Sequence, residues 1–164
     1  KRAACFLYVG ESSVAIVYLF FGRQRQMCIE DRHTLSHDAF IENCRMIVEA
    51  TDLPVNADLE NCGADDPKTA ARAITRAAEA GVVGGSIEDS TGNREHPIYD
   101  FSLAVERVQA AVEAARALPF PFMLTARAEN LPHGRNDHDD TIKRLQAFEA
   151  VTYTHLTLPT NRDG

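Results

Sequence analysis

Residues 53–67 read Leu-Pro-Val-Asn-Ala-Asp-Leu-Glu-Asn-Cys-Gly-Ala-Asp-Asp-Pro, a pattern that indicates a strand followed by a loop and a helix. The run from Leu53 to Ala57 is typical of a short buried strand. Asp66-Pro67 supplies a helix N-cap followed by proline at the first helical position. Asp58 and Glu60 are therefore predicted to lie in a strand-to-helix loop, which is where α/β proteins place their functional groups.

Two later segments repeat this arrangement. Val82-Val-Gly-Gly-Ser-Ile87 runs straight into Glu88-Asp89, and Phe120-Pro-Phe-Met-Leu-Thr-Ala126 runs straight into Arg127-Ala-Glu129. If the three strands are parallel neighbours, their carboxyl ends share one edge of the sheet. That edge would carry Asp58, Glu60, Glu88 and Arg127. Carboxylates beside one arginine indicate a metal-assisted site for an anionic substrate.

Helical periodicity fills the chain between these strands. Helices are predicted at about 36–50, from Pro67 to near Gly81, after Asp100 and after Asp139-Asp140. Alternating strands and helices predict an α/β fold with parallel strands, either a doubly wound sheet or a (β/α)8 barrel. Functional residues at three successive strand ends favour the barrel, and no G-x-G-x-x-G or Walker loop is present.

Two details of packing also follow from the pattern. The strand at 120–126 is almost wholly apolar, which predicts that it is covered on both faces. The last helix is expected to turn Ile142, Leu145 and Phe148 inward.

Composition narrows the class of protein. The chain has 164 residues and a net charge of −7, with no basic stripe that could follow a phosphate backbone, so nucleic acid is not expected as a partner. The apolar run Val14 to Phe21 is too short for a bilayer, which needs about 20 residues, so no membrane partner is expected. Four cysteines without C-x-x-C spacing indicate reduced thiols and a cytoplasmic location.

The regular pattern covers only the middle of the chain. We expect a partial (β/α) barrel domain at 33–150, preceded by an unassigned segment at 1–32 and followed by an unassigned tail at 151–164. Val14 to Phe21 can form a strand, but the two terminal segments match no functional pattern and resemble spurious translated ends.

The motifs Asp58-Leu-Glu60, Ser86-Ile-Glu-Asp89 and Leu124-Thr-Ala-Arg127 together resemble the isocitrate lyase and phosphoenolpyruvate mutase superfamily. The sequence is most similar to its less characterised branch, over about residues 34 to 150. The resemblance implies a (β/α)8 TIM barrel of the phosphoenolpyruvate mutase type, present here as an incomplete set of strand-helix units. It also implies a homo-oligomer, a tetramer, in the complete protein.

The resemblance further implies Mg²⁺ and a small 2-oxo or 2-hydroxy (di)carboxylic acid, with a carbon-carbon bond cleaved or a carboxyl group lost through an enolate. Asp58, Glu60 and Glu88 would be the metal ligands, and Arg127 and Asn56 would bind the substrate. Arg127 can also pair with Glu88 or Glu129, and Asp89 can brace the loop instead of serving the site. Asn56 stands where mutase-like members have their first aspartate, a change expected to weaken metal binding unless Glu60 compensates.

Other departures keep two alternatives open. The loop Ser90-Thr-Gly-Asn-Arg-Glu-His-Pro97 lacks the cysteine of characterised lyases, which argues against isocitrate cleavage by that route. The chain could instead be a non-catalytic anion-binding barrel or an inactive fragment of an enzyme, and phosphonate P–C chemistry is less favoured. His133 to Asp140 is predicted to be a polar loop and helix cap, not a metal cluster. Cys62 is more consistent with a small substitution than with a nucleophile.

Overall fold

A computed structural model of the chain describes residues 4–9, 15–20 and 36–153. The elements are, in order, β1 (Ala4–Val9), β2 (Ala15–Phe20), α2 (His37–Glu49), β3 (Asn56–Asp58), α3 (Pro67–Glu79), β4 (Gly84–Glu88), α4 (Phe101–Arg116), β5 (Met123–Arg127) and α5 (His138–Tyr153). Much of the predicted segment 1–32, and the tail from 154 on, lie outside the described residues. The domain boundaries therefore stay a prediction.

The central sheet is parallel and its strands follow the order of the chain, β3-β4-β5. Helix α3 connects the first pair of strands and α4 connects the second. Each new strand is thus added at the same edge, whereas a doubly wound sheet reverses its strand order at a switch point. The predicted α/β fold with parallel strands is confirmed, and this strand order is the one a barrel uses.

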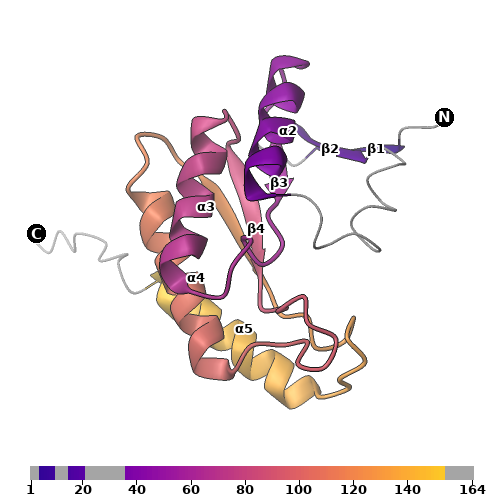
Figure 1. The fold of residues 1–164 in the computed structure, drawn as a ribbon, viewed down its shortest axis with the longest axis vertical. Helices are drawn as coiled ribbons and strands as arrows, with labels where there is room; N and C mark the ends of the chain where they lie inside the picture. Colours follow the sequence, from indigo (N-terminus) through magenta and orange to yellow (C-terminus); the bar gives the residue numbers. More distant parts are fainter. Residues whose placement is uncertain (1–3, 10–14, 21–35, 154–164) are drawn as a thin grey trace, which may run out of the picture.

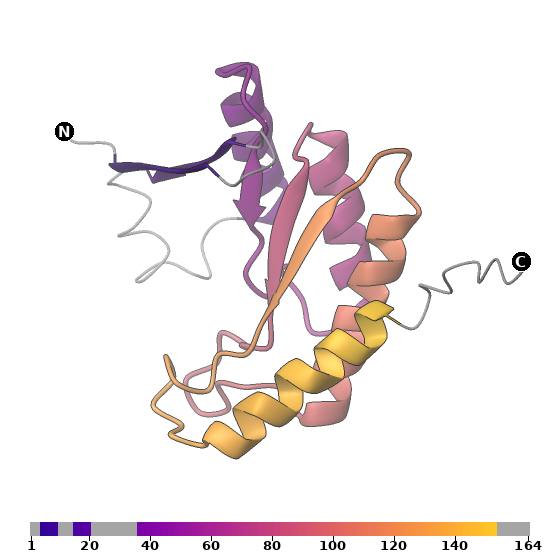
Figure 2. The same cartoon turned by 180° about the vertical axis from the view of Figure 1, so that it is seen from behind.

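The two faces of the sheet differ in chemistry. Ala57, Leu59 and Ile87 are buried on one face and belong to the core, which α3 and α4 cover (Figure 1). The opposite face, turned to the viewer in Figure 2, carries the alternate residues of each strand, because successive side chains in a strand point to opposite sides. Those alternate residues include Asp58 at the end of β3 and Glu88 at the end of β4.

Local sequence explains why the first crossover helix begins and ends where it does. Asp66 is its N-cap and accepts a hydrogen bond from the Thr69 backbone N–H at 2.9 Å, and Pro67 follows at the first helical position. Gly81 follows the end of α3, and its backbone lies in the left-handed region with φ +94°. Small side chains let α3 lie close to the sheet; its fully buried residues are Ala70, Ala73, Ile74 and Ala77.

Several predictions on packing are wrong. β5 begins at Met123, after Pro119 and Pro121, and the side chain of Met123 is 68% exposed, so this strand is not covered on both faces. Ile142 and Leu145 are also exposed, whereas Phe148 is buried as expected. The reason is that Arg144, Phe148 and Val151 form the inner face of α5, and Arg144 is held there by buried hydrogen bonds.

The described amino-terminal part is a hairpin. β1 pairs with β2 in antiparallel register, with Ala4 opposite Phe20. The sequence predicted the strand near Val14 to Phe21 and missed β1. Within the described ranges, no helix is long and apolar enough to cross a membrane.

Candidate functional site at the carboxyl ends of the strands

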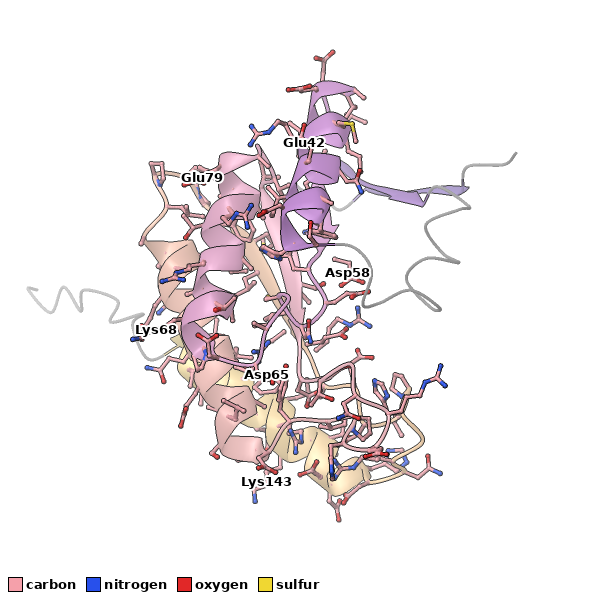
Figure 3. The ribbon with its side chains drawn as sticks, in the orientation of Figure 1. Glu42, Asp58, Asp65, Lys68, Glu79 and Lys143 are labelled. Atoms are coloured by element: carbon pink, nitrogen blue, oxygen red, sulfur yellow. The ribbon has the colours of Figure 1, made fainter. Side chains whose placement is uncertain are left out.

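Three predicted site residues end three neighbouring strands. Asp58 is the last residue of β3, Glu88 of β4 and Arg127 of β5. The strand register places Glu88 directly beside Arg127, and Ser86 beside Asp58. In Figure 3 Asp58 projects away from α3, on the other side of β4. The structure therefore brings these three side chains together, as their positions in the sequence predicted.

Arg127 is the centre of the arrangement. Its Nη1 lies 3.2 Å from Asp58 Oδ2 and 3.7 Å from Glu88 Oε2. Its Nε donates a hydrogen bond of 2.8 Å to Glu129 Oε1, which also lies 2.8 Å from Nη2. Burial alone would lower the pKa of Arg127, but Asp58, Glu129 and Glu88 outweigh it and raise that pKa. The guanidinium is therefore a permanent cation that three carboxylates surround.

Asp58 is fixed in orientation yet reachable from solvent. Its Oδ1 accepts hydrogen bonds from Ser86 Oγ at 2.7 Å and from the Glu60 backbone N–H at 3.2 Å. Its side chain is 49% exposed and that of Arg127 is 40% exposed. A ligand can thus approach this pair without unfolding of the protein around it.

Glu88 is the buried carboxyl of the site, with a side chain that is only 8% exposed. Burial, followed by the charge of Glu129, raises its pKa from 4.5 to about 7. Arg127 opposes this rise, and Asp58 and Glu60 add to it. Near neutral pH this carboxyl is therefore divided between its protonated and ionised forms.

Glu60 approaches the site through a tight turn after β3. Glu60 and Cys62 have positive φ angles of 50° and 58°, and the Glu60 carbonyl accepts a hydrogen bond of 3.0 Å from the Glu88 N–H. Arg107, only 1% exposed, closes this turn by donating to the carbonyl oxygens of Asn61, at 2.5 Å, and Ala64. Sequence reasoning missed Arg107; its signal is an arginine within the apolar stripe of α4.

Asn56, the other predicted substrate residue, lies two positions before Asp58 on the same face of β3. It sits opposite Gly84, and a Cβ atom added to Gly84 would lie 2.6 Å from Asn56 Nδ2. Because Gly84 has no side chain, the Asn56 amide has space beside β4. This amide lies farther from the carboxyl ends of the strands than Asp58 does. The structure does not place Asn56 against Arg127.

A buried cysteine and the start of α5 resolve two alternatives left by the sequence. Cys62 is fully buried, and burial raises the pKa of its thiol to about 12, so it is not a competent nucleophile. Asp139 and Asp140 lie in the first turn of α5, and Asp137 Oδ1 accepts a hydrogen bond from the Asp140 N–H at 2.9 Å. This segment is a helix cap, as predicted.

The donor chemistry of the site fits Mg²⁺ in part. Among the described residues, no group of three or more acids, histidines or cysteines could hold a metal by itself. Asp58 and Glu88 do converge on the same nitrogen of Arg127, and Glu60 and Glu129 add further negative charge. Mg²⁺ commonly uses one or two carboxylates together with water and substrate oxygens, and Asp58 and Glu88 are a pair of this kind.

Comparisons with known proteins agree with this fold. A sequence model described as phosphoenolpyruvate phosphomutase matches residues 12–152. The chain is 56% identical to a "putative lyase/mutase" from Burkholderia cenocepacia J2315, with a TM-score of 0.69 over 72% of this chain and 42% of that one. The chain belongs to the phosphoenolpyruvate phosphomutase family. No curated protein matches it.

More distant solved structures share the fold. A 2,3-dimethylmalate lyase is 22% identical, with a TM-score of 0.68 over 80% of this chain and 47% of that one. A phosphonopyruvate hydrolase in complex with oxalate and Mg²⁺ is 21% identical, with a TM-score of 0.68 over 79% of this chain and 44% of that one. The chain therefore spans less than half the length of each of these three structures.

Proposed function

We propose that the complete protein is a Mg²⁺-dependent carbon-carbon lyase or decarboxylase. Its substrate would be a small 2-oxo or 2-hydroxy (di)carboxylic acid that reacts through an enolate. The family model is described as a mutase, and solved structures of similar fold include a 2,3-dimethylmalate lyase and a phosphonopyruvate hydrolase. The observation that carries the proposal is the reachable arginine that faces Asp58 and the buried Glu88 at the strand ends.

Arg127 is the substrate-binding group in this proposal. Glu129 holds Nε and Nη2, so Nη1 is the corner of the guanidinium that faces the reachable Asp58. A guanidinium binds a planar carboxylate through directed, charge-assisted hydrogen bonds, which a lysine cannot reproduce. Asn56 would contribute from deeper on the same face of the sheet.

Asp58 and Glu88 would hold the metal, and Glu60 would assist from the turn. When bound, Mg²⁺ supplies Lewis-acid stabilisation of negative charge on the oxygens of a 2-oxo acid. The phosphonopyruvate hydrolase of similar fold contains Mg²⁺ together with oxalate, which supports this choice of ion. Ser86 keeps the Asp58 carboxylate aligned through its hydrogen bond to Oδ1.

Turnover by the complete protein tests this proposal. Candidate 2-oxo and 2-hydroxy dicarboxylates, together with phosphonopyruvate as a comparison, are supplied with and without Mg²⁺, and product is followed by chromatography. We expect Mg²⁺-dependent cleavage of a carbon-carbon bond in one of these substrates. This activity should be lost in Arg127→Ala. The matched control is Arg76→Ala, since Arg76 also pairs with an aspartate, Asp38, but lies in α3 away from the strand ends.

The alternative is a non-catalytic anion-binding barrel. Asn56 favours it, because an amide replaces a carboxylate on the face that would hold the metal. Binding of oxalate or pyruvate to the complete protein without turnover of any substrate would select this alternative. Cleavage of phosphonopyruvate alone would instead move the assignment to P–C chemistry.

Partners and location remain part of the proposal. We expect the complete protein to be a homotetramer in the cytoplasm that binds a small carboxylate substrate and neither nucleic acid nor a membrane. Cys44 and Cys62 are free thiols, which supports a reducing compartment.

A further inference from the structure

We propose that Asp89 is a positioning residue that sets the orientation of Arg127 through Glu129. This inference rests on the proposed role of Arg127 as the substrate-binding group. It concerns a buried acid that the proposed chemistry does not use. Asp89 is 2% exposed and follows Glu88 directly, on the opposite side of the chain from the site.

Asp89 contacts the Arg127 segment at two points. Its Oδ1 accepts a hydrogen bond from the Glu129 backbone N–H at 2.8 Å, and its own N–H donates to the Arg127 carbonyl oxygen at 3.3 Å. The short segment that leaves β5 is therefore tied to the end of β4 beyond the last strand pair. These two bonds fix the backbone from which the Glu129 side chain extends.

The second carboxylate oxygen of Asp89, Oδ2, is held by Arg144 of α5. Arg144 Nη1 lies 3.2 Å from Asp89 Oδ2 and donates to the Tyr99 carbonyl oxygen at 2.9 Å. Arg144 Nε donates to Asp140 Oδ2 at 2.7 Å, so this guanidinium is fixed by three acceptors. Arg144 is only 4% exposed, which leaves Asp89 little freedom to move.

The Glu129 side chain connects this fixed backbone segment to Arg127 in the site. Its side chain is 10% exposed and accepts the Nε–H of Arg127 at 2.8 Å, while Oε1 also lies 2.8 Å from Nη2. Glu129 therefore grips one edge of the guanidinium and sets the direction of Nη1. Groups that orient metal ligands commonly change metal affinity or activity by about ten- to a hundredfold when removed, and we expect an effect on this scale from a group that orients Arg127.

Stability alone is a weak reason for this arrangement. Removing two charges from water costs free energy, and apolar residues often replace a buried ion pair without loss. Burial raises the pKa of Asp89 even though the Glu129 N–H and Arg144 act in the opposite direction. The directed hydrogen bonds that Asp89 makes to the Glu129 N–H and Arg144 are a better explanation for a buried acid at this place.

The test is an NMR measurement on the guanidinium of Arg127 in the full chain. Nε–H exchanges slowly with water when it is hydrogen bonded, and Arg127→Lys assigns the signal by its disappearance. In Asp89→Asn one of the two oxygens is lost as an acceptor, so the Arg127 Nε–H signal should lose its protection from exchange. Binding of oxalate with Mg²⁺ should weaken by roughly tenfold or more.

Asp140→Asn is the matched control. It removes the charge of an acid that accepts from Arg144 Nε and Asn130 Nδ2, while the remaining amide oxygen can still accept there and the bond from Asp89 to Glu129 is untouched. We expect the Arg127 signal and oxalate binding to remain as in the unmodified chain. If Asp140→Asn changes them as much as Asp89→Asn does, the effect is structural and the inference is wrong.

Other outcomes are also decisive. An Asp89→Asn chain that is folded and keeps both the protected Arg127 signal and its oxalate affinity overturns the inference. If Asp89→Asn does not fold, Arg144→Lys takes its place, since it keeps the buried charge but cannot contact all three acceptors. An unchanged Arg127 signal in Arg144→Lys would likewise overturn it. If the complete protein with the unmodified sequence binds no oxalate, the proposed function fails, while the exchange of the Arg127 Nε–H still decides the positioning role.

Discussion

Two aspartate-arginine pairs in this protein have the same separation and opposite surroundings. Asp58 and Arg127 approach to 3.2 Å with side chains that are 49% and 40% exposed. Asp89 and Arg144 also approach to 3.2 Å, but their side chains are 0% and 4% exposed. The first pair ends β3 and β5, and the second joins the end of β4 to α5.

The two pairs differ in exposure and not in distance, and exposure decides which pair can bind a ligand and which can only support the structure around it. An exposed pair contributes about 0 to 1 kcal/mol, so a ligand can displace one partner at little cost. A buried pair is costly to break, since the partner left behind is an unpaired charge without water. The reachable pair can therefore exchange partners, while the buried pair keeps its geometry.

The largest expected effect comes from the same substitution made at both pairs. Asp89→Ala should lower the free energy of unfolding by about 3 to 5 kcal/mol, because it leaves Arg144 partly unpaired and the Glu129 N–H without its acceptor. Asp58→Ala should change it by no more than about 1 kcal/mol. Urea denaturation followed by circular dichroism measures both. Equal losses at the two positions would remove the distinction between the pairs.

Arg127→Ala, at the exposed pair, should have a large effect on ligand binding, although substitutions at this pair are expected to change stability little. Charged hydrogen bonds contribute about 1.5 to 3 kcal/mol, so oxalate affinity in the presence of Mg²⁺ should fall by about ten- to a hundredfold. Arg127→Lys should recover little of it, because an ammonium cannot present a planar pair of donors. Arg76→Ala, at an exposed pair that joins α3 to α2, should leave the affinity unchanged. A lysine variant that binds as well as the original chain would contradict the role given to the guanidinium.

Glu88 is expected to make the stability of the protein depend on pH. Its pKa is raised from 4.5 to about 7, so the folded state holds this proton more tightly than the unfolded chain does. The resulting contribution to stability is complete below about pH 4.5 and is lost as the pH rises through about 7. Without Mg²⁺, the stability of the unmodified chain should therefore fall across this range relative to Glu88→Gln.

The same proton should compete with the metal. Mg²⁺ needs the ionised carboxylate, so its affinity should increase as the pH rises through about 7. Denaturation and Mg²⁺ titration over this range measure the two effects separately. A stability difference between the chain and Glu88→Gln that does not vary with pH would show that Glu88 is ionised throughout.

The smallest expected effect is that of Ser86→Ala. It removes the 2.7 Å hydrogen bond that aligns Asp58, at a reachable position where water can replace the hydroxyl. We expect a change of about 0.5 to 1.5 kcal/mol in oxalate binding and less in stability. Isothermal titration resolves a change of this size. A loss as large as that of Arg127→Ala would mean that Ser86 contacts the ligand itself.

Much of the reachable site could be predicted from the sequence. Asp58, Glu88 and Arg127 each follow an apolar run, and parallel strands bring such positions to one edge. The N-cap Asp66 with Pro67 located α3 for a similar reason, since its signal is local. These predictions needed only spacing and the chemistry of each residue type.

The supporting pair could not be predicted in this way. Asp89 and Arg144 lie 55 positions apart, and a pattern that treats charged residues as exposed gives no reason to pair them. The inner face of α5 was misassigned for the same reason, because Arg144 is buried where Ile142 and Leu145 were expected to be. Arg107 was missed as a buried arginine within an apolar helical stripe.

The most direct test of the account is isothermal titration of oxalate into the folded chain with and without Mg²⁺. Oxalate resembles the planar, charged enolate that the proposed reaction forms. We expect binding that requires Mg²⁺ and that is lost in both Asp58→Ala and Arg127→Ala, while Arg76→Ala binds as the unmodified chain does. Binding that is indifferent to Mg²⁺, or that survives both site variants, would contradict the assignment of the strand ends as the functional site.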